Sequence, residues 1–236
     1  MDKEIYFIIP AAGTGSRMGA EIPKQYLKIA GETILTHTLR LFLQTEGIMG
    51  GVVVRSPNDT TDINIQSPVL WEVEGGQTRT ESVANGLRFL ADKRLCEGKS
   101  LDNVWVAVHD AARPGFRLEE LAHFFQAVIA DNPEGGAIMA LPAQDTVKLV
   151  KGQHIEKTLN RDHIWLAQTP QMAPLALLLS ATEKAAQENA IVTDEASLLE
   201  YNGYLPKVYR GYPHNFKITY PEDLQLMTLY FSEREK

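Results

Sequence analysis

Residues 5–26 read IYFIIPAAGTGSRMGAEIPKQY and join a short apolar run to a glycine-rich turn. The apolar run is brief and rich in isoleucine, which predicts a strand buried in a parallel sheet. The alanines and glycines that follow carry almost no side chain, so a ligand can approach the main chain and accept hydrogen bonds from backbone N–H groups. Arg17 and Lys24 add two positive charges. The stretch therefore predicts a phosphate site at the end of the first strand.

Two common phosphate-binding motifs do not match this turn. A P-loop requires a Lys-Ser or Lys-Thr pair after its glycines, and the dinucleotide fingerprint requires Gly-x-Gly-x-x-Gly. Gly13, Gly15 and Gly19 are spaced with one residue too many. An ordinary tight turn is the alternative, but Arg17 and Lys24 favour nucleotide binding. The stretch resembles the signature of the sugar- and polyol-phosphate nucleotidyltransferases, which implies a Rossmann-like domain.

Composition limits the classes of function. The 236 residues are 44% hydrophobic and 22% charged, which fits one globular domain spanning residues 1–236. The formal net charge is −7, so no nucleic-acid partner and no membrane surface are expected. Cys96 is the single cysteine, which rules out an intrachain disulfide. The chain contains neither a signal-type segment nor 18 consecutive apolar residues, and we expect a cytoplasmic protein.

Strand-like and helix-like segments alternate through the first two thirds of the chain. A helical pattern at 35–43 follows the first turn, and Gly50-Gly51 is expected to close that helix. Strands are predicted at 52–55, 69–73, 104–108 and 136–141, with helical patterns between them, and this alternation is typical of a parallel sheet. A second glycine turn follows the strand at 69–73. It predicts a nucleobase pocket bordered by Gly76 and Gln77, with the Ser82 hydroxyl near the base or phosphates; the alternative is a loop that enters a capped helix. Ligands of such sheets bind beyond the carboxyl ends of the strands.

The segment HDAARP, residues 109–114, follows the predicted strand at 104–108. Asp110 is well placed to hold Mg²⁺, directly or through water, or to bind a ribose hydroxyl. We expect Arg113 to form an ion pair that holds the loop, and His109 to pack or hydrogen-bond locally.

The alternation stops near residue 143. Residues 143–160 read as a β-hairpin arm, because apolar and polar residues alternate on both sides of Lys151-Gly152-Gln153. A strand is then predicted at 164–168, and residues 169–171 are expected to end it. A helix is predicted over 175–188, and residues 193–196 can cap another. Residues 215–219 read as a strand in which Lys217 points away from the buried face, before a final helix that opens at Pro221.

Eight separated motifs, in order along nearly the whole chain, resemble the 2-C-methyl-D-erythritol 4-phosphate cytidylyltransferase family of isoprenoid synthesis. The motifs are 10–26, 75–82, 109–114, 145–148, 160–161, 165–171, 193–197 and 216–223. The resemblance implies an α/β fold, a Rossmann-like nucleotidyltransferase domain with a mostly parallel sheet and a protruding β-hairpin arm. It also implies Mg²⁺ as cofactor, a homodimer, and a reaction in which CTP and the polyol phosphate give 4-diphosphocytidyl-2-C-methyl-D-erythritol and pyrophosphate.

The resemblance assigns roles residue by residue. Arg17 and Lys24 stabilise the transition state, while Arg161 and Lys217 position the substrate phosphate. The predicted nucleotide contacts are Pro10, Ala11, Ala12, Gly13, Thr14, Gly15, Gly76, Gln77, Arg79, Ser82, Asp110 and Ala111. The predicted substrate contacts are Asp110, Thr146, Arg161, Thr169, Thr193 and Lys217. Gln77 departs from the family pattern, because many members carry an acid there.

The chemistry of the reaction agrees with these residues. A phosphate monoester has a second pKa near 6 and is mostly dianionic at pH 7, so its attack needs no general base. The difficulty is repulsion between anions and charge on the departing pyrophosphate, which fixed cations and a metal ion relieve. Two alternatives remain open: a cytidylyltransferase for ribitol phosphate or another polyol phosphate, and a CTP-binding domain without turnover. We further expect that backbone carbonyls near Ala11, Ala12 and Gly13 accept from the cytosine amino group, and that the arm crosses to a partner subunit.

Overall fold

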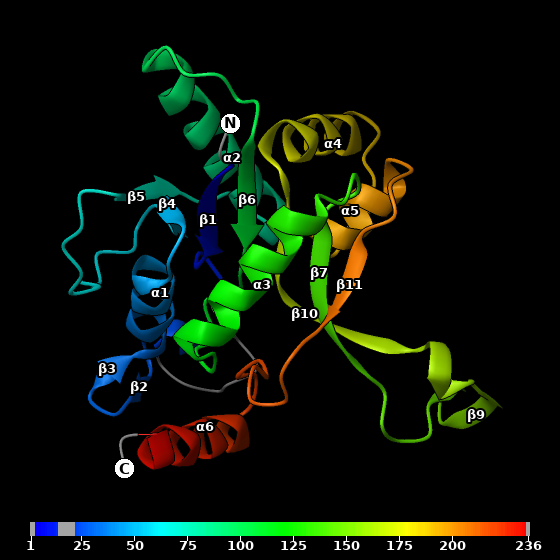
Figure 1. Ribbon diagram of the computed structural model, residues 1–236. Helices are drawn as coiled ribbons and strands as arrows, with labels where there is room; N and C mark the ends of the chain where they lie inside the picture. Colours follow the sequence, from blue (N-terminus) through cyan, green and yellow to red (C-terminus); the bar gives the residue numbers. More distant parts are fainter. Residues whose placement is uncertain (1–2, 14–21, 235–236) are drawn as a thin grey trace.

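A seven-stranded sheet forms the centre of the protein in this computed structural model, which describes residues 3–13 and 22–234. The strand order is β11-β7-β10-β6-β1-β4-β5. The first strand, β1 (Glu4–Pro10), pairs in parallel with β4 (Ile48–Arg55) and β6 (Val104–Val108). At the edge, β5 (Leu70–Glu74) pairs in parallel with β4. The predicted Rossmann-like, mostly parallel sheet is confirmed (Figure 1).

The other half of the sheet contains one reversal of direction. The strand β10 (Trp165–Pro174) runs antiparallel to both β6 and β7 (Ala137–Pro142), and β11 (Lys207–Arg210) runs parallel to β7. The prediction that residues 169–171 end this strand is wrong. The strand continues because its later residues pair with β6 as well as β7, with a register shift between Ala167 and Gln171.

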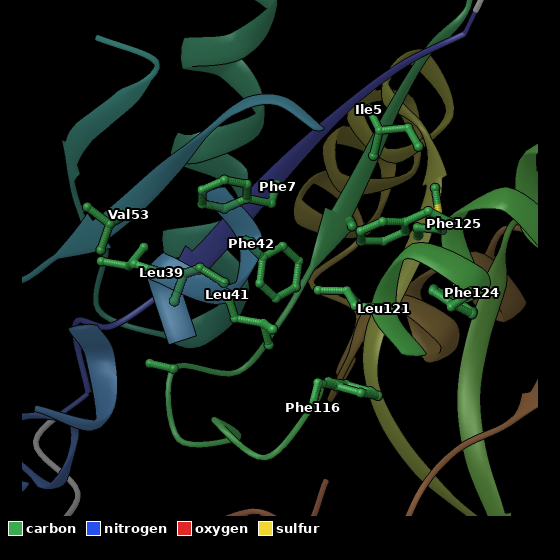
Figure 2. Packing of buried hydrophobic residues seen from close by; sticks show 14 of the residues in the cluster. Ile5, Phe7, Leu39, Leu41, Phe42, Val53, Phe116, Leu121, Phe124 and Phe125 are labelled. Atoms are coloured by element: carbon green, nitrogen blue, oxygen red, sulfur yellow. The ribbon is translucent and has the colours of Figure 1, made fainter. Parts of the chain in front are cut away.

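Alternate side chains of β1 build the two layers of the core. Ile5, Phe7 and Ile9 face the cluster under α1 (Ile34–Gln44) and α3 (Leu118–Asp131), which Figure 2 shows. Tyr6 and Ile8 face the opposite cluster. That cluster packs against α2 (Arg79–Cys96), α4 (Leu175–Gln187) and α5 (Glu195–Tyr201). The period-two alternation of a strand thus explains why one apolar run supports helices on both faces.

Gly50 and Gly51 were expected to close the first helix, and this prediction is wrong. The helix α1 ends at Gln44, and both glycines lie inside β4. A Cβ atom on Gly51 would approach the Phe7 ring to 2.4 Å. The glycine is therefore required by the packing of the neighbouring strand rather than by a turn.

The predicted arm is a two-stranded antiparallel hairpin that projects from the sheet (Figure 1). It consists of β8 (Lys148–Lys151) and β9 (His154–Thr158), followed by the single turn η3 (Arg161–His163). Every residue of both strands is exposed. The two strands of the arm pair with each other, and neither buries a face against the rest of the described chain.

The segment before the last helix is not the strand that was predicted at 215–219. Its backbone bonds to other parts of the chain: Ile218 N–H donates to the Ala112 carbonyl at 2.9 Å, and Thr219 N–H donates to Asp223 at 2.8 Å. The final helix α6 (Pro221–Arg234) follows and packs near the short strands β2 (Lys28–Ile29) and β3 (Glu32–Thr33). Within the described ranges, none of the helices combines the length and apolarity needed to cross a membrane.

Candidate functional site

A cavity of about 350 Å³ opens beyond the carboxyl ends of β1, β5 and β6. Its walls come from segments far apart in the sequence, as expected for a ligand site in such a sheet. The lining residues are Pro10, Ala11, Ala12, Gly13, Lys24, Gln25, Gly76, Gln77, Thr78, Arg79, Ser82, Asp110, Ala111, Ala112, Lys217 and Thr219. The cavity thus collects every predicted nucleotide contact in the described residues; Thr14, Gly15 and the catalytic candidate Arg17 lie outside these residues.

The turn after β1 is fastened to the short turn η2 (Lys24–Tyr26). The buried Gln25 amide donates to the Ala11 carbonyl at 2.7 Å and to the Gly13 carbonyl at 3.0 Å. Sequence reasoning did not assign Gln25 a role, although it stands in the quoted stretch. Of the three carbonyls expected to read cytosine, those of Ala11 and Gly13 each already accept one hydrogen bond from Gln25, whereas neither of these two bonds goes to the Ala12 carbonyl.

The second glycine turn lies directly against the first. A Cβ atom on Gly75 would stand 2.5 Å from the Ala12 side chain. The alternative interpretation, a loop entering a capped helix, is also present, because Thr78 caps α2 by accepting from Glu81 N–H at 3.1 Å. The Ser82 hydroxyl donates to the Thr78 carbonyl at 2.9 Å and accepts from Gly76 N–H at 3.2 Å. Ser82 therefore holds the pocket wall and has an acceptor position, not its proton, to offer a ligand.

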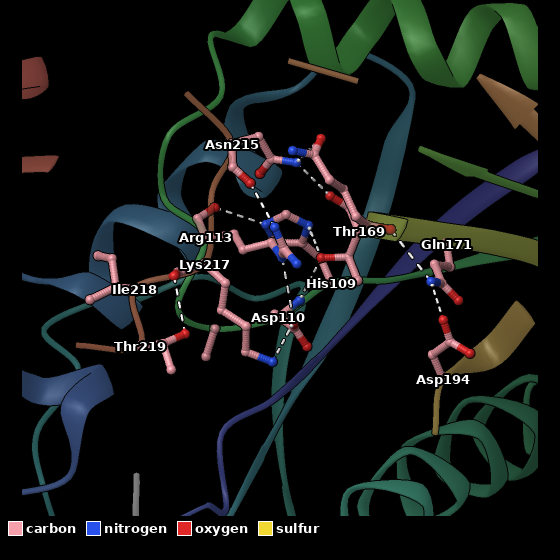
Figure 3. A network of polar contacts seen from close by, with 12 residues as sticks. His109, Asp110, Arg113, Thr169, Gln171, Asp194, Asn215, Lys217, Ile218 and Thr219 are labelled. Atoms are coloured by element: carbon pink, nitrogen blue, oxygen red, sulfur yellow. Dashed lines mark hydrogen bonds and ion pairs between the residues drawn. The ribbon is translucent and has the colours of Figure 1, made fainter. Parts of the chain in front are cut away.

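Asp110 is the centre of a charge cluster that Figure 3 shows in part. Its carboxylate lies 2.8 Å from Lys217 Nζ, 3.3 Å from Arg79 Nε and 3.4 Å from Arg113 Nε. Burial opposes ionisation of Asp110, but the charges of Arg79, Lys217 and Arg113 outweigh it and hold its pKa well below the usual range. The predicted ion pair of Arg113 is confirmed, and its guanidinium also donates to the Asn215 carbonyl at 2.8 Å.

Arg79 joins this cluster to α5. It donates to both carboxylate oxygens of the buried Glu195, at 2.8 and 3.1 Å. This bidentate pair is a strong and geometrically specific arrangement. Burial alone would lower the pKa of Arg79, but Glu195 and Asp110 raise it, so Arg79 stays charged. Glu195 was not singled out from the sequence, although it stands in the motif at 193–197.

His109 is fully buried and fixes the geometry around Asp110. Its Nε2 lies 2.9 Å from the Arg113 carbonyl, an acceptor, so Nε2 must carry the hydrogen of a neutral ring. Its Nδ1 then accepts from the Thr169 hydroxyl at 3.0 Å, and that hydroxyl accepts from Asp110 N–H at 3.1 Å. Burial lowers the pKa of His109 to about 4, which agrees with the neutral form. The expected local role of His109 is confirmed, and Thr169 supports Asp110 from outside the cavity lining.

Lys24 and Lys217 reach the same wall of the cavity. Lys24 Nζ donates at 2.9 Å to the carbonyl of Ile218, the neighbour of Lys217. The prediction that Lys217 points away from the buried face holds in part: Ile218 is fully buried, while Lys217 turns to Asp110 instead of to open solvent.

Three predicted substrate contacts lie elsewhere in this chain. Thr146 and Arg161 stand on exposed parts of the arm and its base, and the Arg161 guanidinium donates to the Gln144 carbonyl. Thr193 is exposed just before the cap of α5. None of the three lines the cavity described above. A single chain therefore does not bring them together with Lys24 and Lys217.

The carboxylate, histidine and cysteine side chains near the cavity determine how a divalent cation can be held. Among the described residues, Asp110 is the only carboxylate in the cavity lining, and no group of three or more His, Cys, Asp or Glu side chains could hold a metal ion. Mg²⁺ is commonly held by one or two carboxylates together with substrate phosphates and waters. The residues present fit a cation that arrives on a triphosphate, and do not fit one held by the protein alone.

The family of the chain follows from comparison with known proteins. Residues 5–233 match the family model of 2-C-methyl-D-erythritol 4-phosphate cytidylyltransferase. The chain belongs to this family. Among curated cytidylyltransferases of this name, that of Photorhabdus laumondii is 42% identical, with coverage of 98% of this chain and 96% of the relative. That of Burkholderia multivorans is 43% identical, with coverage of 96% and 95%.

Solved cytidylyltransferase structures agree with this assignment. The crystal structure of a 4-diphosphocytidyl-2C-methyl-D-erythritol synthase aligns with a TM-score of 0.81 and 34% identity, over 98% of this chain and 100% of that chain. The 2-C-methyl-D-erythritol 4-phosphate cytidylyltransferase of Francisella tularensis aligns with a TM-score of 0.80 and 36% identity, over 96% and 99%. The fold and family predicted from the sequence are confirmed.

Proposed function

We propose that this protein transfers the cytidylyl group of CTP to 2-C-methyl-D-erythritol 4-phosphate, giving 4-diphosphocytidyl-2-C-methyl-D-erythritol and pyrophosphate. The observation that carries the proposal is the cavity itself, where two small-residue turns meet Lys24 and the Asp110 charge cluster. Small residues admit phosphates to backbone N–H groups, and the lysines supply charge where the anions meet.

The reaction is a displacement at the α-phosphorus of CTP. A phosphate oxygen of the polyol phosphate forms the new P–O bond, and the bond to the departing pyrophosphate breaks. The nucleophile is already dianionic, so the protein contributes position and fixed charge instead of a base. We assign Lys24 and Arg17 to the charge that develops during transfer, and Lys217 to the incoming phosphate; Asp110 holds the Lys217 ammonium group in place.

Mg²⁺ is proposed as the cofactor, carried into the cavity by the triphosphate. When bound, it would neutralise phosphate charge, and Asp110 is the residue of the lining that could contact it directly or through water. Both Asp110 oxygens already face cationic side chains in the free protein, with which a bound cation would have to share them.

We further propose a homodimer in which the arm of each chain completes the site of its partner. Thr146 lies on the arm and Arg161 directly after it, both outside the lining of the cavity of their own chain. The arm exposes the apolar side chains of Val150 and Ile155 by 52% and 62%, and an isolated hairpin is marginal in water. A two-fold dimer would cover both arms symmetrically.

Subunit exchange tests the shared site. Inactive Lys24→Ala and Arg161→Ala dimers are mixed and allowed to exchange, so each hybrid has one doubly mutated and one fully wild-type site. Random exchange should then restore about a quarter of wild-type activity. If each site were built within one chain, no activity would return.

Pyrophosphate release tests the reaction and separates the alternatives. Purified protein is assayed with CTP and Mg²⁺, once with 2-C-methyl-D-erythritol 4-phosphate and once with ribitol 5-phosphate. Release with the first substrate alone is the expected result. Faster release with ribitol phosphate would assign the polyol alternative, and release with neither would leave a CTP-binding protein. The cytoplasmic location stays a prediction, which cell fractionation tests.

A further inference from the structure

The loop between β4 and β5 is tied to η2, the turn that carries Lys24, by a buried polar network that the mechanism above does not use. Arg55 ends β4 and is 7% exposed. Its guanidinium donates to Tyr26 Oη at 3.3 Å and to Asp59 Oδ1 at 3.0 Å. It also donates to Glu72 at 2.7 Å and to the Thr61 carbonyl. One arginine thus joins η2, the loop and the edge strand β5.

Asp59 is the centre of this network within the loop. It accepts from the Tyr26 hydroxyl on one oxygen, and from Arg55 and Thr61 N–H on the other, the latter at 3.1 Å. Burial alone would raise the pKa of Asp59, but the hydrogen bonds of Tyr26, Thr61 and Arg55 lower it to about 2. Burial and Asp59 raise the pKa of Tyr26 to about 12. Tyr26 is therefore a neutral donor and Asp59 an ionised acceptor throughout the neutral pH range.

The turn that receives this support has little stability of its own. The η2 turn is three residues long, and each residue is held by a different part of the chain. Lys24 donates to the Ile218 carbonyl, Gln25 donates to the turn after β1, and Tyr26 donates to Asp59. So short a 3₁₀ turn cannot fix a side chain through its own backbone bonds. The direction of Lys24 therefore depends on what Gln25 and Tyr26, the other two residues of the turn, hold, as well as on its own bond to the Ile218 carbonyl.

We propose that Asp59 and Arg55 are positioning residues for Lys24, which they orient through the Tyr26 hydroxyl. The loop that carries Asp59 thereby becomes part of the transfer machinery, although it does not line the cavity. The inference rests on the proposed role of Lys24. Its physical basis is that displacement of a catalytic group by about 1 Å can cost 10²-fold in rate.

Two variants and one matched control test the network. Tyr26→Phe removes only the hydroxyl, and Asp59→Asn removes the charge of its acceptor. The control is Asp62→Asn, because Asp62 is an exposed carboxylate of the same loop that accepts from Asn64 N–H at 2.8 Å. We expect kcat to fall about tenfold in the first two variants, with KM for CTP little changed, and neither to change in the control.

Each substitution is made both in the wild-type protein and in Lys24→Ala protein, and the comparison separates a positioning role from a structural one. In Lys24→Ala protein, Tyr26→Phe and Asp59→Asn should cause no further loss of kcat, since the group they orient is gone. A purely structural role would multiply the two losses. Equal losses in both backgrounds, or a loss in Asp62→Asn, would overturn the inference.

A second readout does not depend on turnover. Acetylation of the Lys24 amine, followed by mass spectrometry, should be faster in Tyr26→Phe and Asp59→Asn than in wild type and Asp62→Asn. Unchanged Lys24 acetylation in the two variants contradicts the inference even if the wild type is active. Wild-type protein that fails to release pyrophosphate, but shows the expected acetylation pattern, contradicts the proposed function and leaves the positioning of Lys24 supported.

Discussion

Acidification should weaken the fold through His109 before the carboxylates titrate. The ring is fully buried, donates to the Arg113 carbonyl and accepts from the Thr169 hydroxyl. A proton on Nδ1 would replace that acceptor by a donor and force the Thr169 hydroxyl to find another partner. It would also place a cation beside Arg113, which the neighbouring Asp110 only partly offsets.

The size of the effect follows from the shift in pKa. Burial lowers the pKa of His109 to about 4 from a reference of 6.5, so between these values the unfolded chain binds more protons than the folded one. Stability therefore falls as the pH falls through this window. At about 1.4 kcal/mol per pKa unit, the loss is about 2 kcal/mol between pH 7 and pH 5, and about 3 kcal/mol once His109 is fully titrated.

Urea unfolding at pH 7, 6 and 5 measures this loss. His109→Gln keeps a donor for the Arg113 carbonyl and cannot titrate, and His109→Asn keeps a group that faces Thr169. Both variants should lose less stability than the wild type over this range, whereas His123→Gln, at an exposed histidine, should follow the wild type. Asp59, whose pKa is lowered to about 2 from 3.8, stabilises the fold fully above the ordinary Asp pKa and loses this contribution only as the pH falls from about 4 to about 2, so the two windows are separate. Equal pH slopes in wild type and His109 variants would refute the reasoning.

Three further predictions concern the cavity. Lys24→Ala should leave the fold intact and lower kcat by about 10² to 10³, the usual loss for one group aimed at developing charge, and steady-state kinetics that changed KM alone would exclude a transition-state role. UTP should be a poor substrate by roughly 1 to 3 kcal/mol, because it offers an acceptor where cytosine offers an amino group to the Ala12 carbonyl; comparable kcat/KM for CTP and UTP would contradict this. Gln25→Leu should lower the free energy of unfolding by about 1 to 3 kcal/mol, since it leaves the Ala11 and Gly13 carbonyls without their donor, and thermal unfolding with no change would show that water replaces the amide.

Local patterns predicted much of the architecture. The apolar run at 5–9, the alternation of strands and helices, and the hairpin around Gly152 were all readable, because strand and helix periodicities depend on near neighbours. The same patterns misplaced the end of β10 and the residues 215–219, whose hydrogen bonds go to distant strands and loops. The prediction that Gly51 ends a helix was wrong for the same reason, since a side chain at Gly51 would collide with the Phe7 ring of the neighbouring strand.

The motifs of the sequence by themselves determined the family and many of the residues that line the cavity, because the signature at 10–26 and the strand ends can be recognised without knowledge of packing. Only the tertiary structure decided how those residues act. Arg79 reaches Glu195 across 116 residues of chain, and Tyr26 reaches Asp59 across 33. Such pairs cannot be recognised from periodicity in the sequence, since each depends on where folding brings two distant segments. Burial and the neighbouring groups then determine the charge of each side chain and the direction of its hydrogen bonds.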